Sequence, residues 1–111
     1  MKLALCFTGE ARSFEKGYEF YKNNLLNDYD VDVYIHCWDD KLDKEKILDL
    51  YKPKAYKFEG KPPNDGITEK YKLNNPEPYK RPAWNAYCMF YSIHQASLLI
   101  DGEYDWVIKS R

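Results

Sequence analysis

The order of apolar and polar positions predicts four strands. Lys2–Gly9 is an almost continuous apolar run, typical of a parallel-sheet strand that is buried on both faces. Val31–Trp38 is rich in β-branched and aromatic residues and predicts a second strand. Lys54–Glu59 predicts a weaker third strand near a sheet edge, because its lysines alternate with apolar positions. Tyr104–Ile108 predicts a fourth.

Helices are predicted between these strands. Ser13 can cap a helix over 13–26, whose aromatic and apolar residues recur along one face. A second helix is predicted over 43–51 and is stopped by a following proline. A long helix over 82–99 opens on a proline, which is favoured at the first helical position. The stretch 60–81 has no clear period and is expected to be a flexible loop.

This alternation of strands and helices predicts an α/β fold built from βαβ units. The expected architecture is a Rossmann-like three-layer sandwich with a mostly parallel sheet. Right-handed crossovers favour the strand order 3-2-1-4, numbered along the chain. At 111 residues the chain is expected to form a single domain over 1–111 with one core.

The helix over 82–99 carries apolar residues on two faces, so it is expected to be buried on two sides. The sheet can cover one side, and the second cover would be the 60–81 loop, another subunit or further chain. One stripe consists of Trp84, Tyr87, Cys88, Tyr91 and Leu98. The other consists of Ala86, Met89, Phe90, Ile93 and Ile100. Its polar residues, Asn85, Ser92, His94 and Gln95, could touch a ligand if they face the crevice described next.

In an open sheet of this order, ligands bind beyond the carboxyl ends of the strands, where the order reverses. The first strand delivers Thr8, Gly9 and Arg12 to that crevice, and the fourth delivers Lys109 and Arg111. A glycine allows close backbone approach, helix amides face the crevice, and guanidinium groups bind phosphate bidentately. These residues therefore predict an anion site for a nucleotide diphosphate. Alternatively, Gly9 is ordinary turn punctuation and Arg12 pairs with a neighbouring glutamate.

The end of the second strand offers further candidates. Trp38 could stack on a base, and Asp39 could accept hydrogen bonds from a ribose. Alternatively, Asp39 or Asp40 caps the second helix while His36 and Trp38 pack under it. A zinc site from His36, Asp39 and Asp40 lacks a plausible further ligand. The residues after the first strand form neither a dinucleotide fingerprint nor a P-loop, which argues against dinucleotides and ATP hydrolysis.

Composition narrows the function classes. The 17 basic and 18 acidic residues give a formal net charge of −1, so no global field favours nucleic acid or a membrane surface. The apolar start, Met1–Gly9, is too short to span a membrane. Cys6, Cys37 and Cys88 each lie in an apolar run and are expected to be reduced thiols of a cytoplasmic protein.

With these residues assembled, the chain resembles the N-terminal half of a glycosyltransferase-like family found in bacteria, phages and large viruses. Members of that family have the GT-A, nucleotide-diphospho-sugar transferase type of fold. The resemblance covers most of the chain outside 60–81. Its segments are LALCFTGEARSFEKGYE, DVDVYIHCWDD, LYKPKAYKFE, MFYSIHQA and YDWVIKSR.

The resemblance implies sugar transfer from a nucleotide-sugar donor, with the Gly9–Arg12 loop contacting the nucleotide. It also implies a divalent metal, Mn²⁺ or Mg²⁺, on an acidic turn after the strand that ends near Arg111. That turn and the acceptor-binding half lie beyond Arg111, so the chain is expected to be a truncated GT-A domain that does not complete catalysis by itself. No catalytic residue or metal ligand is assigned within it.

A second function class remains open. The chain could be a non-catalytic binding or assembly module whose aromatic helix over 82–99 forms a homodimer or docks a partner. A third class, a different phosphoryl-handling enzyme, needs a nucleophile that the pattern does not supply, since Cys6 lies within a strand and Cys37 is expected to face the core.

Overall fold

The structure is a computed structural model that describes residues 1–11, 13–39, 43–63 and 83–110. All structural statements below refer to these ranges. Arg12, Asp40, Arg111 and most of the predicted loop over 60–81 lie outside them.

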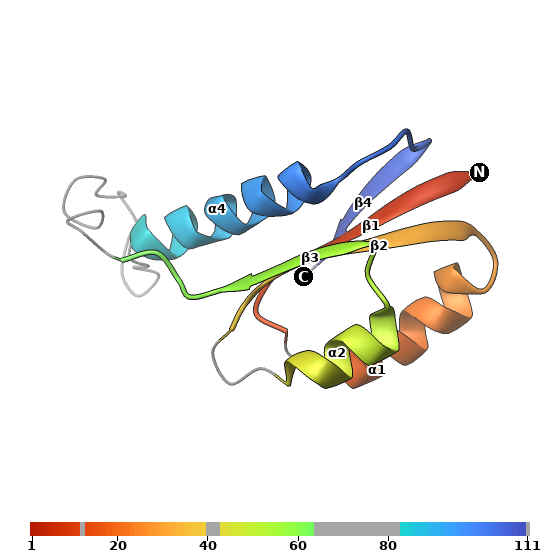
Figure 1. The fold of residues 1–111 in the computed structure, drawn as a ribbon, viewed down its shortest axis with the longest axis horizontal. Helices are drawn as coiled ribbons and strands as arrows, with labels where there is room; N and C mark the ends of the chain where they lie inside the picture. The colour runs from red at the N-terminus through yellow and green to blue at the C-terminus, as the bar shows by residue number, and fades with distance from the viewer. Residues whose placement is uncertain (12, 40–42, 64–82, 111) are drawn as a thin grey trace, which may run out of the picture.

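The fold is α/β, with four parallel strands in the order β3-β2-β1-β4, as the alternation predicts (Figure 1). The strands are β1 (Lys2–Gly9), β2 (Asp30–Trp38), β3 (Ala55–Glu59) and β4 (Trp106–Ser110). The central strand β1 pairs with β2 along its whole length and with β4 from Leu3 to Phe7. The sheet reverses direction of winding between β1 and β4, so this is its topological switch point.

Helices cover both faces of the sheet and make three layers (Figure 1). On one face lie α1 (Phe14–Tyr21), its continuation as the π-helix η1 (Lys22–Leu26), and α2 (Lys44–Tyr51). On the other face lies α4 (Ala83–Leu99), which packs on β1, β2 and β3. The described helices and strands are therefore consistent with a Rossmann-like sandwich.

Two helix starts differ from the predicted capping. Ser13 does precede α1, but its backbone is left-handed (φ 51°) and its side chain makes no capping hydrogen bond. The cap of α2 is Asp43, whose carboxylate accepts a hydrogen bond from the Lys46 amide at 3.2 Å. Asp39 is therefore not the cap of α2, and that alternative is wrong.

The fourth strand begins and ends two residues later than predicted, so Lys109 lies within it. Asp105 explains the late start. Its amide donates to the Lys2 carbonyl, and its carboxylate accepts from the Lys2 amide at 2.8 Å. This reciprocal pair fixes the register in which Leu3 lies opposite Trp106.

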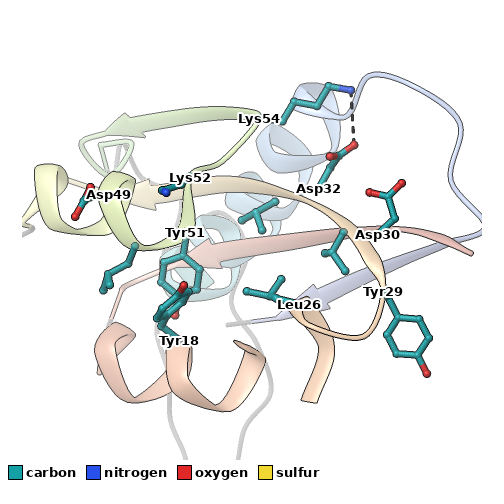
Figure 2. A pocket seen from close by; sticks show the side chains of 12 residues that line it. Tyr18, Leu26, Tyr29, Asp30, Asp32, Asp49, Tyr51, Lys52 and Lys54 are labelled. Atoms are coloured by element: carbon teal, nitrogen blue, oxygen red, sulfur yellow. Dashed lines mark ion pairs between the residues drawn. The ribbon is translucent and has the colours of Figure 1, made fainter. Parts of the chain in front are cut away.

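A cavity of about 540 Å³ opens at the amino-terminal end of β2, between β2, η1 and α2 (Figure 2). Tyr29 and Asp30 lie at one side of it, and Lys52 lies at the other. The Asp32 carboxylate pairs with Lys54 at 3.8 Å and accepts from the Tyr104 hydroxyl at 2.8 Å. This cavity lies at the end of the sheet opposite to the one where the topological rule places a ligand.

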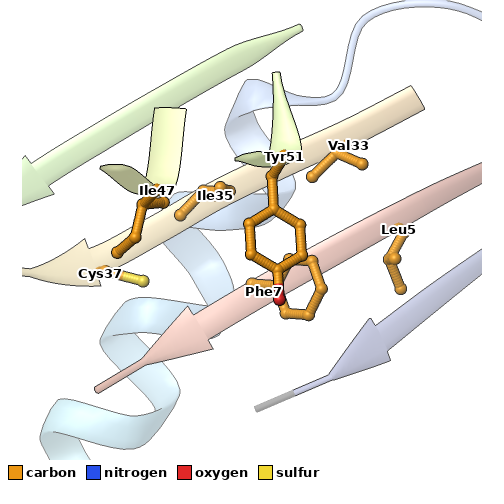
Figure 3. Packing of buried hydrophobic residues seen from close by; sticks show 7 residues of the cluster. All are labelled: Leu5, Phe7, Val33, Ile35, Cys37, Ile47 and Tyr51. Atoms are coloured by element: carbon orange, nitrogen blue, oxygen red, sulfur yellow. The ribbon is translucent and has the colours of Figure 1, made fainter. Parts of the chain in front are cut away.

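The main core lies between the sheet and the α1–α2 layer (Figure 3). It contains Leu5, Phe7, Val33, Ile35, Cys37, Ile47 and Tyr51. The Phe7 and Tyr51 rings meet edge to face at 5.0 Å, and the Tyr51 hydroxyl donates to the Phe14 carbonyl. Cys37 faces this core, as the alternation along β2 predicts, and burial raises the pKa of its thiol to about 12.

The helix α4 is buried on one side, within the described part of the chain. Its sheet-facing residues Cys88, Ser92 and Ala96 are buried. Its exposed apolar residues are Tyr87, Met89, Phe90 and Leu98. The predicted placement of Tyr87 and Leu98 on the same buried stripe as Cys88 is therefore wrong.

Two findings concern the cysteines and the helices. All three cysteines are buried free thiols. Among the described residues, no helix is both long enough and apolar enough to cross a membrane.

Candidate functional site

A second cavity of about 540 Å³ opens at the carboxyl ends of β1 and β2, beside the start of α4. We call it the switch-point cavity, because it adjoins the end of β1, where the strand order reverses. This is the region in which the topological rule predicts a ligand site. Its lining residues are Gly9, Glu10, Trp38, Lys61, Trp84, Asn85, Cys88 and Met89.

Gly9 gives the cavity an open backbone wall. Its φ of +87° is strained for any other residue, and a Cβ built on it would meet no heavy atom within 4 Å. A ligand can therefore approach the main chain here without a side chain in the way. The amide of Gly9 itself is not available to a ligand, since it donates a hydrogen bond to the Ser92 hydroxyl at 2.9 Å.

Behind Gly9 lies a polar network of the buried Ser92 and His36 and the partly buried Glu59, which we call the His36 network. The Ser92 hydroxyl lies 2.6 Å from Nδ1 of His36, and Nε2 of His36 lies 2.6 Å from the Glu59 carboxylate. An ionised carboxylate can only accept hydrogen bonds, so Nε2 of His36 carries a hydrogen and donates the hydrogen bond to Glu59. The network joins the carboxyl ends of three neighbouring strands to the middle of α4.

In the His36 network a hydroxyl, an imidazole and a carboxylate are hydrogen-bonded in the order typical of a nucleophile, a base and an acid. A substrate, however, has no access to the hydroxyl. Ser92 and His36 are both fully buried. The Ser92 hydroxyl also accepts a hydrogen bond from the Gly9 amide, and Ser92 lines none of the three described cavities. The contact that the structure shows for the Ser92 hydroxyl is therefore structural, since it holds the end of β1.

The charge of Glu59 is stabilised within this network. Burial by itself would raise the pKa of Glu59, but the hydrogen bond from His36 and the charge of Lys57, 3.6 Å away, outweigh it. The net result is a pKa below the ordinary glutamate value. The Tyr91 hydroxyl, at 3.5 Å, adds a weaker contact.

Trp38 reaches the cavity, but most of its ring is packed. It is 5% exposed, stacks on Tyr91 with ring centroids 6.1 Å apart, and meets His36 edge to face. Trp38 and His36 thus pack against α4. The alternative in which they pack under α2 is wrong. Little of the Trp38 ring remains for stacking on a base.

Trp84 is the more accessible aromatic ring of the cavity. Its indole nitrogen donates to the Pro62 carbonyl at 2.8 Å, which fixes the ring beside the segment that follows β3. Lys61 from that segment lies 5.8 Å from the ring centroid and 3.2 Å from the Glu10 carboxylate. Lys61 is therefore the cation that the described residues bring to the cavity.

Neither Lys61 nor Trp84 is predicted from the sequence to be a site residue. Lys61 belongs to the aperiodic stretch over 60–81, and the pattern places Trp84 on an apolar stripe of the long helix. One signal in the sequence could have indicated Trp84. It is an aromatic residue in the first turn of the helix over 82–99, and that turn is expected to lie near the carboxyl ends of the strands. Asn85 is one of the polar helix residues predicted to touch a ligand if they face the crevice, and it does line the cavity.

The remaining predicted residues are placed elsewhere or lie outside the described ranges. Lys109 is exposed in β4 opposite Cys6 and does not line the switch-point cavity. Thr8 is buried and lines a smaller cavity of about 110 Å³ on the α1–α2 side. The Asp39 carboxylate lies 3.9 Å from Lys44 and does not line the switch-point cavity. Arg12 and Arg111 lie outside the described residues.

The described residues do not fit a divalent metal. In the ranges described, no group of three or more histidine, cysteine, aspartate or glutamate side chains could hold a metal ion. The carboxylate nearest the cavity, Glu10, pairs with Lys61, and His36 is hydrogen-bonded at both ring nitrogens. No chemical step through Mn²⁺ or Mg²⁺ can be derived from these residues.

No protein-family model, curated protein or solved structure matches this chain.

Proposed function

We propose that the chain is the nucleotide-sugar-binding half of a glycosyltransferase of the GT-A type and that the donor occupies the switch-point cavity. The observation that carries the proposal is a cavity of about 540 Å³ at the topological switch of an all-parallel sheet. That volume is within the usual range for small-molecule sites, roughly 300–1,000 Å³.

The residues of the cavity suggest how the donor is held. Gly9 offers an open backbone wall to the diphosphate, and Lys61 at the rim supplies a positive charge. The ring of Trp84 and the amide of Asn85 suit a nucleobase, which needs an aromatic surface and hydrogen-bonding partners. Arg12 and Arg111, from the two strands flanking the switch, are proposed to add charge to the diphosphate.

The described residues of the cavity bind the donor, and the groups that carry out sugar transfer lie outside the described ranges. If Mn²⁺ or Mg²⁺ takes part, its ligands come from outside the described ranges. The three buried free thiols favour a reducing compartment such as the cytoplasm.

An amide NMR titration of the chain with UDP, GDP and ADP, with and without Mg²⁺, tests the site. We expect shifts at Gly9, Lys61 and Asn85. The cavity of equal volume at the opposite end of the sheet is an internal control (Figure 2). Shifts concentrated at Tyr29 and Asp30 of that cavity, or no shifts at millimolar nucleotide, would overturn the proposal.

A pair of lysine variants sharpens the same test. Lys61→Ala removes the cation of the cavity and should weaken nucleotide binding about ten-fold, which corresponds to about 1.4 kcal/mol. Lys54→Ala, made beside the opposite cavity, is the matched control and should leave the affinity unchanged. Equal effects of both variants on a calorimetric titration would point to non-specific electrostatics.

A second candidate function is a non-catalytic assembly module. It is favoured by the exposed apolar face of α4, where Phe90 is 63% exposed and Leu98 is 65% exposed. In that case nucleotide titrations would show no site, and Phe90→Ala would abolish association with a partner or a second copy.

A further inference from the structure

The outer edge of β4 is unusually apolar. This five-residue strand pairs with β1 on one side, and no described strand pairs with it on the other. Trp106, Val107 and Ile108 are 65%, 53% and 36% exposed, respectively. An edge strand that combines free main-chain groups with large apolar side chains is a template for pairing with another strand.

Both faces of β4 contribute to this exposed surface. The register with β1 places Trp106 opposite Leu3 and Ile108 opposite Leu5, a residue of the core on the α1–α2 side. Val107 lies opposite Ala4, on the α4 side of the sheet. An occupant of this edge must therefore supply apolar side chains to both faces and main-chain groups between them, which only an added strand does.

The segment 105–109 is complementary to its own reverse in charge and matches it in polarity. Asp105 precedes three apolar residues and Lys109 follows them. In an antiparallel pair of two copies centred on Val107, Asp105 of each copy lies opposite Lys109 of the other. Trp106 likewise lies opposite Ile108, and opposed residues point to the same face. Opposite charges face each other twice, and every apolar residue faces an apolar residue.

We propose that β4 is the self-association surface of this chain, forming an antiparallel β4–β4 pair with a second copy about a two-fold axis at Val107. The two four-stranded sheets then become one continuous sheet. Such a contact is isologous, as two-fold dimers require, because the same strand serves both copies. The carboxylate of Asp105, which already accepts from the Lys2 amide, has further acceptor sites for the opposing lysine. The proposal is independent of the nucleotide site.

Charge reversal tests the partnership. The chain should sediment as a dimer in analytical ultracentrifugation, and Lys109→Asp should weaken dimerisation at least ten-fold, because aspartates then face each other. Asp105→Lys should do the same. An equimolar mixture of the two variants should form a heterodimer, since each lysine again faces an aspartate. Circular dichroism checks folding, and if Asp105→Lys unfolds through loss of its Lys2 contact, Lys109→Asp carries the test.

The predicted register gives a second test. Val107→Cys should form a covalent dimer on mild oxidation, because position 107 faces itself across the axis, at a separation that a disulfide spans. Ser110→Cys is the control and should not cross-link. The native cysteines are buried and should not compete. A strict monomer at hundreds of micromolar, or dimers unaffected by charge reversal, would overturn the proposal, the latter in favour of the α4 face.

Discussion

At the scale of the residue, the hydroxyl of Ser92 links the end of β1 to β2. It accepts from the Gly9 amide and lies within hydrogen-bond distance of His36, in a fully buried position. Ser92→Ala should lower the free energy of unfolding by about 1–3 kcal/mol, because it leaves buried polar groups without a partner. Urea unfolding measures this loss.

Ser97→Ala is the matched control, since it makes the same change on the same helix at an exposed position. Within the described ranges, the Ser97 hydroxyl donates to the His94 carbonyl of its own helix. Its replacement should change stability by no more than about 0.5 kcal/mol. Equal losses from both variants would mean that the effect is one of helix propensity and not of the His36 network.

Glu59 should make the stability depend on acid. Its pKa is lower in the folded chain than its ordinary value of 4.5, so its ionised form stabilises the fold above that pH. That contribution is lost as the pH falls through the folded pKa. The stability difference between the wild-type chain and Glu59→Gln should therefore shrink on acidification from neutral pH to about pH 3. Denaturant unfolding at each pH measures this difference.

The exposed Glu103 provides the control substitution for this pH series. The groups that face Glu59 are His36, Lys57 and Tyr91, so the partners that favour its ionised form come from β2, β3 and α4. A constant difference between the wild-type chain and Glu59→Gln over the whole range would contradict the assigned role.

The pairing of these residues could not be read from the sequence. The alternation along β2 does predict that His36 and Trp38 share a face opposite to Ile35 and Cys37, and the structure confirms it. Which helix covers that face is a tertiary fact. His36 and Ser92 are 56 positions apart. No local pattern indicates that a serine on α4 would accept a hydrogen bond from the Gly9 amide.

At the scale of the element, α4 is the clearest departure from expectation. An all-round apolar pattern predicts burial on two sides, yet the face carrying Phe90 is open in the described part of the chain. An apolar helix face predicts that other residues cover it, but the pattern does not indicate which residues these are. The helix bounds, by contrast, agree with the predicted ones to within a residue.

A pair of phenylalanine variants separates the two environments. Phe90→Ala should change stability by about 0.5 kcal/mol or less in the isolated chain, because the ring is exposed. Phe7→Ala removes a core ring packed against Tyr51 (Figure 3) and should cost about 3–5 kcal/mol. A large loss from Phe90→Ala at low protein concentration would show that this face is covered within the single chain.

At the scale of the whole molecule, the sheet order followed from short connections and right-handed crossovers, and it located the end of the sheet where the switch-point cavity lies. The identity of the lining residues did not follow. Trp84 and Lys61 reach the cavity through contacts with Pro62 and Glu10, which depend on how the segment after β3 meets the start of α4. Such a junction is set by packing, not by periodicity.

The placement of β1 between β2 and β4 has a consequence for synthesis on the ribosome. Residues that pair across β1 and β4 are about a hundred positions apart, as the 103-residue separation of Lys2 and Asp105 shows. While the chain emerges, β1 can pair with β2 early, but its other edge stays open until nearly all of the described chain has been translated. A nascent apolar edge of this kind is where chaperones bind and where mispairing between neighbouring chains on a polysome begins.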